Sequence, residues 1–126
     1  MGQSHQVLIV EPRRSVRTML EMILCGEGLQ VFSAASLRSA LLQLRVLQPD
    51  LIILDADTTG SEGGSPISEI RALSKARVMA LDGKGAGGSA PGADHTLAHP
   101  FGASELCAVV SLLLEGSASV AAHIAD

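Results

Sequence analysis

The sequence predicts an α/β fold in which helices cover both faces of a parallel sheet. Two short runs, residues 7–10 and 51–54, are apolar at every position. A strand that is apolar on both faces belongs inside a parallel sheet that is covered on each side. Between the apolar runs lie segments whose apolar residues recur with a helical period. Strands and helices that alternate with short connections form right-handed crossovers, which is the third indication of this fold class.

Five strands are expected in all. The two apolar runs are the strongest, and the remaining three are shorter or less regular. The weaker strands are predicted at residues 29–34, 77–81 and 96–98.

The first two helices have clear apolar stripes. Residues 16–24 place apolar side chains at i, i+3, i+4, i+7 and i+8, and Gly26 follows as a helix stop. Residues 37–47 repeat the pattern behind Ser36, which is a good N-cap residue. Pro49 then prevents the helix from continuing.

The last two helices differ in length and polarity. Ser65 and Pro66 open a short helix, because serine caps the N-terminus and proline suits the first helical position. Residues 104–114 form the last helix and are apolar around most of its circumference. This helix is therefore either well buried or reserves a second face for a partner.

The connection between the fourth and fifth strands lacks a helical period. Residues 82–95 carry five glycines and Pro91, and each glycine costs a helix about 1 kcal/mol relative to alanine. We expect the helix at this place to be reduced or absent. The glycines also match the G-x-G-x-x-G pattern at residues 83–88. The Ser-Ala-Pro-Gly that follows cannot open the helix that a dinucleotide-binding loop requires.

Composition limits the function classes. The 126 residues suit one domain, expected at residues 6–115, with flexible ends or a linker at residues 1–5 and 116–126. No apolar stretch reaches the roughly 18 residues of a membrane span, and the polar N-terminus does not resemble a signal peptide. A net charge of −4 and two aromatic residues argue against nucleic-acid binding by this domain. Cys25 and Cys107 fall in helical patterns and are expected to be small buried side chains of a cytoplasmic protein.

Three acids and a histidine follow the predicted strands. Glu11 follows the first strand, Asp55 the third, Asp82 the fourth and His99 the fifth. Ligands of open α/β sheets bind at the carboxyl ends of the strands. A single acid after a strand is usually a solvated loop residue, but three at one edge indicate a functional site.

The order of these segments resembles the response-regulator receiver domains of two-component signalling. The resemblance covers residues 6–115 and includes the strand ending in Glu11, the segment 49–55, and residues 92–101 with His99 and Pro100. It implies a flavodoxin-like fold with a five-stranded parallel sheet in the order 2-1-3-4-5. It also implies signal transduction in a two-component phosphorelay, without a classical enzymatic activity.

The resemblance further implies roles for individual residues. Asp55 corresponds to the phosphoacceptor, which takes a phosphoryl group from a histidine kinase or a phosphotransfer partner. Glu11 corresponds to one acid of the Mg²⁺ site, and Asp57 to the residue whose backbone carbonyl binds the metal. A divalent ion offsets the repulsion between a carboxylate and an anionic donor.

Four positions depart from the family pattern. Pro12 replaces the second metal-binding acid, so Mg²⁺ binding is expected to be weak or absent. Asp82 replaces a Thr or Ser whose hydroxyl contacts the phosphoryl group, and His99 replaces a lysine that is permanently charged. Thr96 replaces the aromatic switch residue. These changes predict an atypical receiver that accepts phosphate weakly.

Two other functions remain open at this stage. One is a phosphorylation-independent pseudo-receiver that binds a protein partner, or a second copy, through the strand-four/strand-five edge and the last helix. The residues expected on that helix face are Leu106, Val109, Val110 and Leu113. The other is a phosphatase similar to the haloacid dehalogenases, because residues 55–59 fit their D-x-D-x-T pattern. In addition, His99 with Asp82 and Glu11 could bind a transition metal.

Overall fold

The sheet has the predicted composition and order. A computed structural model describes residues 5–82 and 92–125 of the chain. All strand pairs are parallel, in the order β2-β1-β3-β4-β5. The strands are β1 (Gln6–Val10), β2 (Gln30–Ala34), β3 (Leu51–Asp55), β4 (Arg77–Asp82) and β5 (His95–Ala98). The fold class expected from the two apolar runs is thus confirmed.

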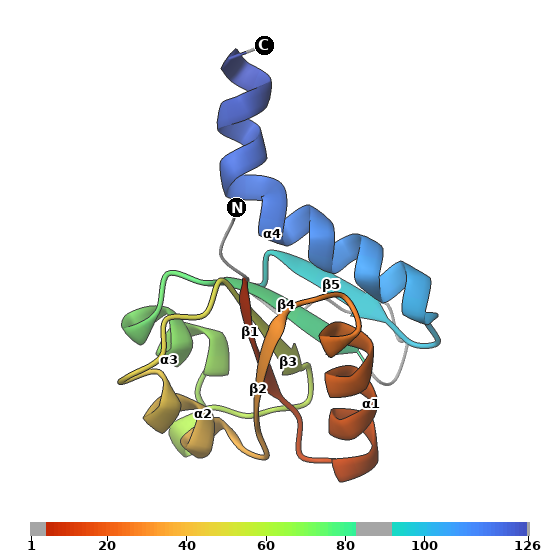
Figure 1. The fold of residues 1–126 in the computed structure, drawn as a ribbon. Helices are drawn as coiled ribbons and strands as arrows, with labels where there is room; N and C mark the ends of the chain where they lie inside the picture. Colours follow the sequence, from red (N-terminus) through yellow and green to blue (C-terminus); the bar gives the residue numbers. More distant parts are fainter. Residues whose placement is uncertain (1–4, 83–91, 126) are drawn as a thin grey trace.

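Within residues 5–82 and 92–125, four α-helices cover the sheet, two on each face (Figure 1). They are α1 (Arg14–Cys25), α2 (Leu37–Gln43), α3 (Pro66–Leu73) and α4 (Ala103–Ala125). The predicted caps are present, since the hydroxyls of Ser36 and Ser65 accept from the backbone N–H of Ser39 and Ser68 at 3.1 and 3.2 Å. Hydroxyl caps of this kind each stabilise a helix by about 1 kcal/mol.

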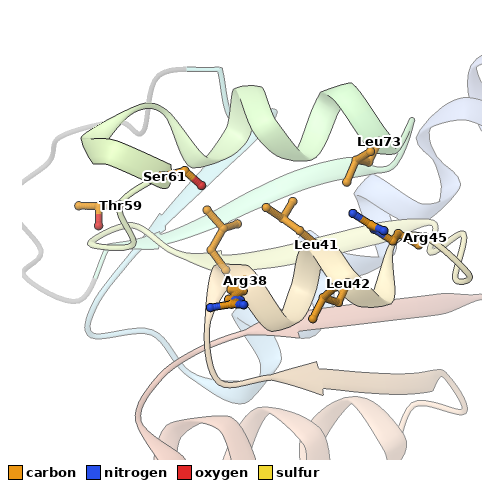
Figure 2. Close-up of a pocket in the computed structure, with 9 residues that line it drawn as sticks. Arg38, Leu41, Leu42, Arg45, Thr59, Ser61 and Leu73 are labelled. Atoms are coloured by element: carbon orange, nitrogen blue, oxygen red, sulfur yellow. The ribbon is translucent and has the colours of Figure 1, made fainter.

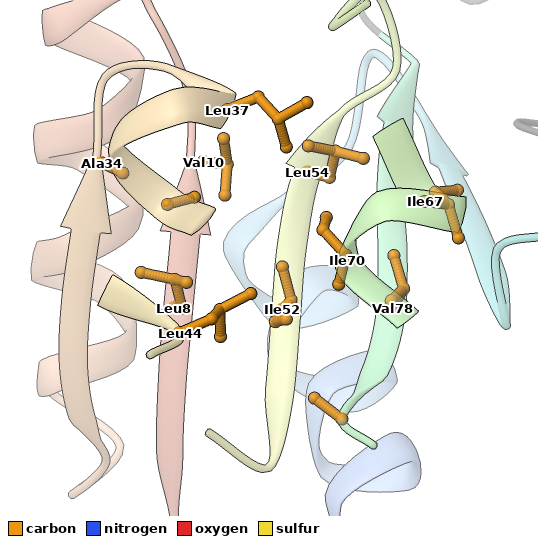
Figure 3. Packing of buried hydrophobic residues seen from close by; sticks show 12 residues of the cluster. Leu8, Val10, Ala34, Leu37, Leu44, Ile52, Leu54, Ile67, Ile70 and Val78 are labelled. Carbon is orange, nitrogen blue, oxygen red and sulfur yellow. The ribbon is translucent and has the colours of Figure 1, made fainter. Parts of the chain in front are cut away.

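Two separate hydrophobic clusters hold the layers together. Alternate side chains of β1 and β3 point to opposite faces, so each central strand contributes to both clusters. Figure 3 shows the cluster beneath α2 and α3. Its buried members are Leu8, Val10, Ala34, Leu37, Ala40, Leu44, Ile52, Leu54, Ile67, Ile70, Ala76 and Val78. The cluster beneath α1 and α4 contains Val7, Ile9, Leu20, Leu24, Leu51, Ile53, Met79, Leu81, Leu97, Leu106 and Val110.

Two helices differ in length from the prediction. The second ends at Gln43 instead of residue 47, and the chain then forms turns up to Val46. The fourth continues from residue 114 to Ala125, because alanine-rich sequence after Gly116 keeps a high helical propensity and one glycine does not stop it. The expected reduction of a helix between β4 and β5 concerns residues 83–91, which lie outside the described residues. The assignment of residues 1–5 and 116–126 as flexible ends or a linker stays a prediction.

The predicted partner face of the last helix is wrong at two positions. Leu106 and Val110 lie one helical turn apart and are 0% and 2% exposed, because both pack against the sheet. Val109 and Leu113 are partly buried against the same cluster. Most of the apolar circumference is thus used for the core, while Leu112 remains 66% exposed.

The prediction that both cysteines are buried is also wrong. Cys25 is exposed and Cys107 is half-buried, and both thiols are free. Cys25 follows the buried Leu24 and is rotated by about 100° from it on the helix, which takes its side chain away from the sheet.

No helix in the described part of the chain combines the length and the apolar character needed to cross a bilayer.

Candidate functional site

The three predicted acids lie at the carboxyl edge of the sheet and are buried there. Glu11 directly follows β1, while Asp55 and Asp82 end β3 and β4. Their exposures are 1%, 6% and 8%. Val10 pairs with Leu54, so the next residues along the two parallel strands, Glu11 and Asp55, are neighbours. Buried carboxylates in adjacent positions repel each other unless a cation balances them.

That cation is Arg13, which the sequence analysis did not identify. Its Nε donates to Glu11 Oε2 and its Nη2 to Glu11 Oε1, both at 3.1 Å. The Arg13 backbone N–H also donates to Glu11 Oε2, at 2.8 Å. Nη2 lies 3.7 Å from Asp55 Oδ1, so one guanidinium faces both acids. Hydrogen bonding to Glu11 and the charge of that residue raise the pKa of Arg13 above its usual range, which keeps the side chain charged.

A second arginine fixes the backbone of the same turn. Arg17 Nη1 donates to the carbonyl of Glu11 at 2.8 Å and lies 3.5 Å from the carbonyl of Pro12. Arg17 also belongs to the first turn of α1, where its backbone N–H donates to Arg13. The chain between β1 and α1 is therefore held at three successive residues, which fixes the start of the Arg13 side chain.

Asp55 has an environment that disfavours its charged form. Burial is the main cause of its raised pKa, and the charges of Glu11 and Asp57 raise the pKa further. The charge of Arg13 and a hydrogen bond from the Asp57 backbone act in the opposite direction. Asp55 Oδ1 is buried and has no hydrogen-bond partner among the described residues. Strongly perturbed carboxyls in such positions are typical of functional sites.

The loop that follows Asp55 is tied to α3. Ser61 donates to Glu69 from its backbone N–H at 2.6 Å and from its hydroxyl at 2.7 Å. Gly60 lies beneath this contact, and a Cβ at that position would come within 2.5 Å of Glu69 Oε2 and of the Gly64 carbonyl. A larger residue would push the loop away from α3. Gly60 therefore keeps the chain after Asp55 close to the helix.

The residues present do not fit the expected Mg²⁺ site. Magnesium requires nearly octahedral oxygen coordination at short distance. Both Glu11 oxygens already accept from Arg13, and Pro12 offers no side-chain ligand. Asp57 is exposed and would contribute only its carbonyl. The transition-metal alternative is wrong, because the described residues include no group of three His, Cys, Asp or Glu side chains that could hold a metal, and so no such set of Glu11, Asp82 and His99.

A backbone hydrogen bond joins two of the predicted residues at the ends of β4 and β5. The His99 backbone N–H donates to the Asp82 carbonyl at 3.0 Å, which extends the pairing of the two strands. The His99 ring lies against Phe101, with ring centroids 4.5 Å apart. Its Nε2 is buried and has no hydrogen-bond partner in the described structure. Thr96 is half-buried and lies opposite Ala80.

A pocket of about 690 Å³ lies elsewhere, between α2 and the loop before α3 (Figure 2). Its lining combines leucines such as Leu41 and Leu42 with Arg38 and Arg45. None of the predicted site residues lines it. The glycine motif at residues 83–88 lies outside the described residues.

The sheet order and the acidic edge define a signalling domain of the α/β receiver class. A family model described as "Response regulator receiver domain" matches residues 7–111. The chain belongs to this family of two-component signalling proteins. Receiver domains are signalling modules and not classical enzymes, so the phosphatase alternative has no support.

Two curated relatives illustrate the similarity. The KDP operon transcriptional regulatory protein KdpE of Escherichia coli K12 is 35% identical over 113 residues, which cover 86% of this chain and 50% of KdpE. The DNA-binding response regulator MtrA of Mycobacterium tuberculosis H37Rv is 32% identical over 110 residues, which cover 83% of this chain and 48% of MtrA. The chain thus spans about half the length of these relatives.

Solved structures share the fold. The receiver domain of the sensor histidine kinase PA1611 from Pseudomonas aeruginosa PAO1 has a TM-score of 0.75 and 22% identity, covering 89% of this chain and 98% of that one. In that structure a magnesium ion is coordinated in the active-site cleft. A CheY-like receiver domain from Methylobacillus flagellatus has a TM-score of 0.71 and 19% identity, covering 88% and 99%.

Proposed function

We propose that this receiver domain accepts a phosphoryl group on Asp55 from a histidine kinase or a phosphotransfer protein. The observation that carries the proposal is the position of Asp55. It ends the central strand β3, lies beside the buried Glu11, and has one oxygen, Oδ1, without a hydrogen-bond partner in the described part of the chain. Arg13 Nη2 lies 3.7 Å from this oxygen, so a positive charge stands beside the nucleophile of the proposed reaction.

The proposed reaction transfers the phosphoryl group without water. An Asp55 carboxylate oxygen attacks the phosphorus of a phosphohistidine, and the P–N bond breaks as the new P–O bond forms. The electron pair of the broken bond returns to the imidazole, which leaves as the neutral base after taking up one proton. The main barrier is the repulsion between the carboxylate and the phosphoryl oxygens, so positive charge at the site promotes the reaction.

Acceptance of phosphate is weak in this proposal. Asp82 stands where the family places a hydroxyl, and an ionised carboxylate cannot donate a hydrogen bond to the phosphoryl group. His99 stands where the family places a lysine, and Thr96 is too small to act as the aromatic switch. We also propose that Mg²⁺ binding is weak or absent at the expected ligands Glu11, Asp55 and the Asp57 carbonyl.

The proposed partners follow from the family and the edge of the sheet. A histidine kinase or phosphotransfer protein supplies the phosphoryl group. A protein partner, or a second copy, contacts the β4/β5 side of the domain, where β5 is the edge strand. The relatives named above are transcriptional or DNA-binding regulators, and we place this domain in the cytoplasm. It makes no DNA contact of its own in this proposal, because its net charge is −4 and it has two aromatic residues.

A second candidate function is a pseudo-receiver that binds its partner without phosphorylation. The observation that favours it is the occupation of both Glu11 oxygens by Arg13. A site in which Glu11 is already paired with a cation of the chain can keep one conformation permanently. In that case the partner surface is always available.

Incubation with acetyl phosphate, followed by intact-mass analysis, tests the first proposal. We expect one added phosphoryl group that hydroxylamine removes, as it does with acyl phosphates. Asp55→Asn should abolish the addition. Glu105→Gln, which removes an exposed carboxylate in the first turn of α4, should leave it unchanged. Absence of the phosphoryl group in the folded wild-type chain would support the pseudo-receiver instead.

A further inference from the structure

The positive charge beside Asp55 is part of the protein chain. Glu11 is 1% exposed, and each of its oxygens accepts a hydrogen bond from the Arg13 guanidinium. The same Nη2 is 3.7 Å from Asp55 Oδ1. Arg13 thus bridges the two acids that a divalent ion would have to bind.

Direct binding of Mg²⁺ to Glu11 requires that Arg13 leaves first. The metal needs oxygen lone pairs at short distance, and both Glu11 oxygens already accept hydrogen bonds from Arg13. The departure of Arg13 would break its bidentate, charge-assisted pair with Glu11 and leave that carboxylate buried without its cation. Pro12 has no side-chain oxygen, so the metal would receive no compensating ligand there.

We infer that the Arg13 guanidinium takes the cation position of this receiver site and makes the site independent of Mg²⁺. The statement about the metal depends only on the geometry around Glu11 and Asp55. Its consequence for signalling deepens the proposed function and rests on it: phosphorylation of Asp55 proceeds with Arg13 as the local positive charge.

The geometry of Arg13 suits this role. Its side chain is 52% exposed although its partners are buried, so the guanidinium lies at the boundary between the acids and solvent. A planar guanidinium pairs with two oxygens of a phosphoryl group as readily as with a carboxylate. After transfer from acetyl phosphate, the Asp55–phosphorus bond is formed, acetate leaves with the electron pair, and Arg13 faces the new anionic oxygens.

Calorimetric titration with MgCl₂ tests the metal part of the inference. We expect no saturable binding to the wild-type chain. Arg13→Gln should show saturable Mg²⁺ binding, because Glu11 is then free to coordinate. Arg14→Gln removes the same charge from the adjacent exposed position and should behave like the wild type. Equal Mg²⁺ affinities of the wild type and Arg13→Gln would overturn the inference.

A measurement on the wild-type chain covers the case in which Arg13→Gln does not fold. The Arg13 Nε–H donates to Glu11, so its NMR signal should be protected from exchange with solvent. We expect this signal to keep its position and protection when MgCl₂ is added. Loss of protection at saturating Mg²⁺ would show that the metal displaces the guanidinium, and the inference would be wrong.

Labelling with acetyl phosphate distinguishes a failure of the proposed function from a failure of the inference about Arg13. We expect wild-type labelling to be equal in EDTA and in MgCl₂. Arg13→Gln labelling should require Mg²⁺. If no chain is labelled while only Arg13→Gln binds Mg²⁺, the proposed function fails and the assignment of the cation position stands. If wild-type labelling requires Mg²⁺, the inference fails and the phosphoacceptor proposal stands.

Discussion

The two halves of the carboxyl edge balance their charges differently. We call the side formed by Glu11, Arg13 and Asp55 the acceptor half, and the side formed by Asp82, Thr96 and His99 the switch half. In the acceptor half two buried acids share one guanidinium. In the switch half a backbone hydrogen bond joins Asp82 and His99, and the His99 ring packs on Phe101. The described contacts of the acceptor half are thus mainly ionic, whereas a backbone hydrogen bond and ring packing contribute to the switch half.

This difference bears on how a signal would pass through the domain. A phosphoryl group on Asp55 changes the charge in the acceptor half, where Arg13 can respond directly. A response in the switch half needs a side chain that reaches from β4 or β5 to the new group. Thr96 is short and His99 packs on Phe101, so we expect charge changes at Asp55 to have small effects on β5.

The largest expected effect comes from removing the shared cation. Arg13→Gln should lower the free energy of unfolding by about 2 kcal/mol, because it leaves Glu11 buried without its charged partner. This loss of stability is smaller than that expected for a fully buried ion pair, because the Arg13 side chain is half exposed. Urea unfolding followed by circular dichroism measures the change. Arg14→Gln is the matched control, for which we expect less than about 0.5 kcal/mol; equal losses in both variants would remove the distinction between the halves.

The second prediction concerns the ion pair between Arg71 and Asp94, which lies at the start of β5. Asp94 Oδ2 accepts from the Val78 backbone N–H at 2.8 Å and from Arg71 Nη2 at 3.0 Å. Asp94→Ala should cost about 1–2 kcal/mol, because the Val78 N–H loses its partner. Asp94→Asn keeps an acceptor oxygen and should cost less. A loss in Asp94→Asn as large as that in Asp94→Ala would assign the stability to charge alone.

The contribution of Asp94 should also depend on pH. Burial opposes its ionisation, but the hydrogen bonds from Val78 and Arg71, together with the charges of Arg71 and Arg77, outweigh burial and lower its pKa. A carboxyl with a lowered pKa in the folded state stabilises the protein above its ordinary pKa of 3.8 and loses this effect as pH falls through the folded value. The difference between the wild type and Asp94→Ala should thus shrink below about pH 4. A constant difference would contradict the assignment.

The strands of the sheet could be predicted from the sequence, because the central strands must be apolar on both faces. Residues 7–10 and 51–54 are apolar at all positions, so only a central parallel strand can bury them. Once those strands are parallel, the positions of Glu11 and Asp55 at one edge follow without further information. The edge strand β2 was also found, although its burial is incomplete.

Side-chain pairing could not be predicted in the same way. Whether Arg13 turns toward Glu11 depends on the backbone angles after Pro12 and on the arginine rotamer, and neither has a periodic signal. The signal in the sequence for this pairing was a basic residue, Arg13, two positions after the strand-end acid Glu11. Similarly, the stripe at Leu106 and Val110 fits a core face and a partner face equally well until the sheet is present.

A further prediction concerns the energetic cost of the ionised Asp55 side chain in the acceptor half. The raised pKa of Asp55, caused mainly by burial, means that the ionised form destabilises the folded state. Asp55→Asn should therefore raise the free energy of unfolding at neutral pH by about 1 kcal/mol. The gain should fade as pH falls through the raised folded pKa toward 3.8, where the wild-type carboxyl is protonated too. Thermal melts across this pH range, with Glu105→Gln as control, test the sign; a destabilised Asp55→Asn at pH 7 would mean that its pairing with Arg13 outweighs its burial.

The smallest expected effect is in the switch half. The His99 Nε2 is buried and has no hydrogen-bond partner among the described residues, so its burial is not offset by a hydrogen bond there. His99→Leu keeps most of the contact with Phe101 and removes that atom, and its stability should stay within about 1 kcal/mol of the wild type, on the stable side. Phe101→Ala is the comparison variant, because it removes the ring on which His99 packs and should be the more destabilising of the two. If His99→Leu instead costs more than Arg13→Gln in the same urea titration, the switch half depends on the imidazole charge, and the two halves are organised alike.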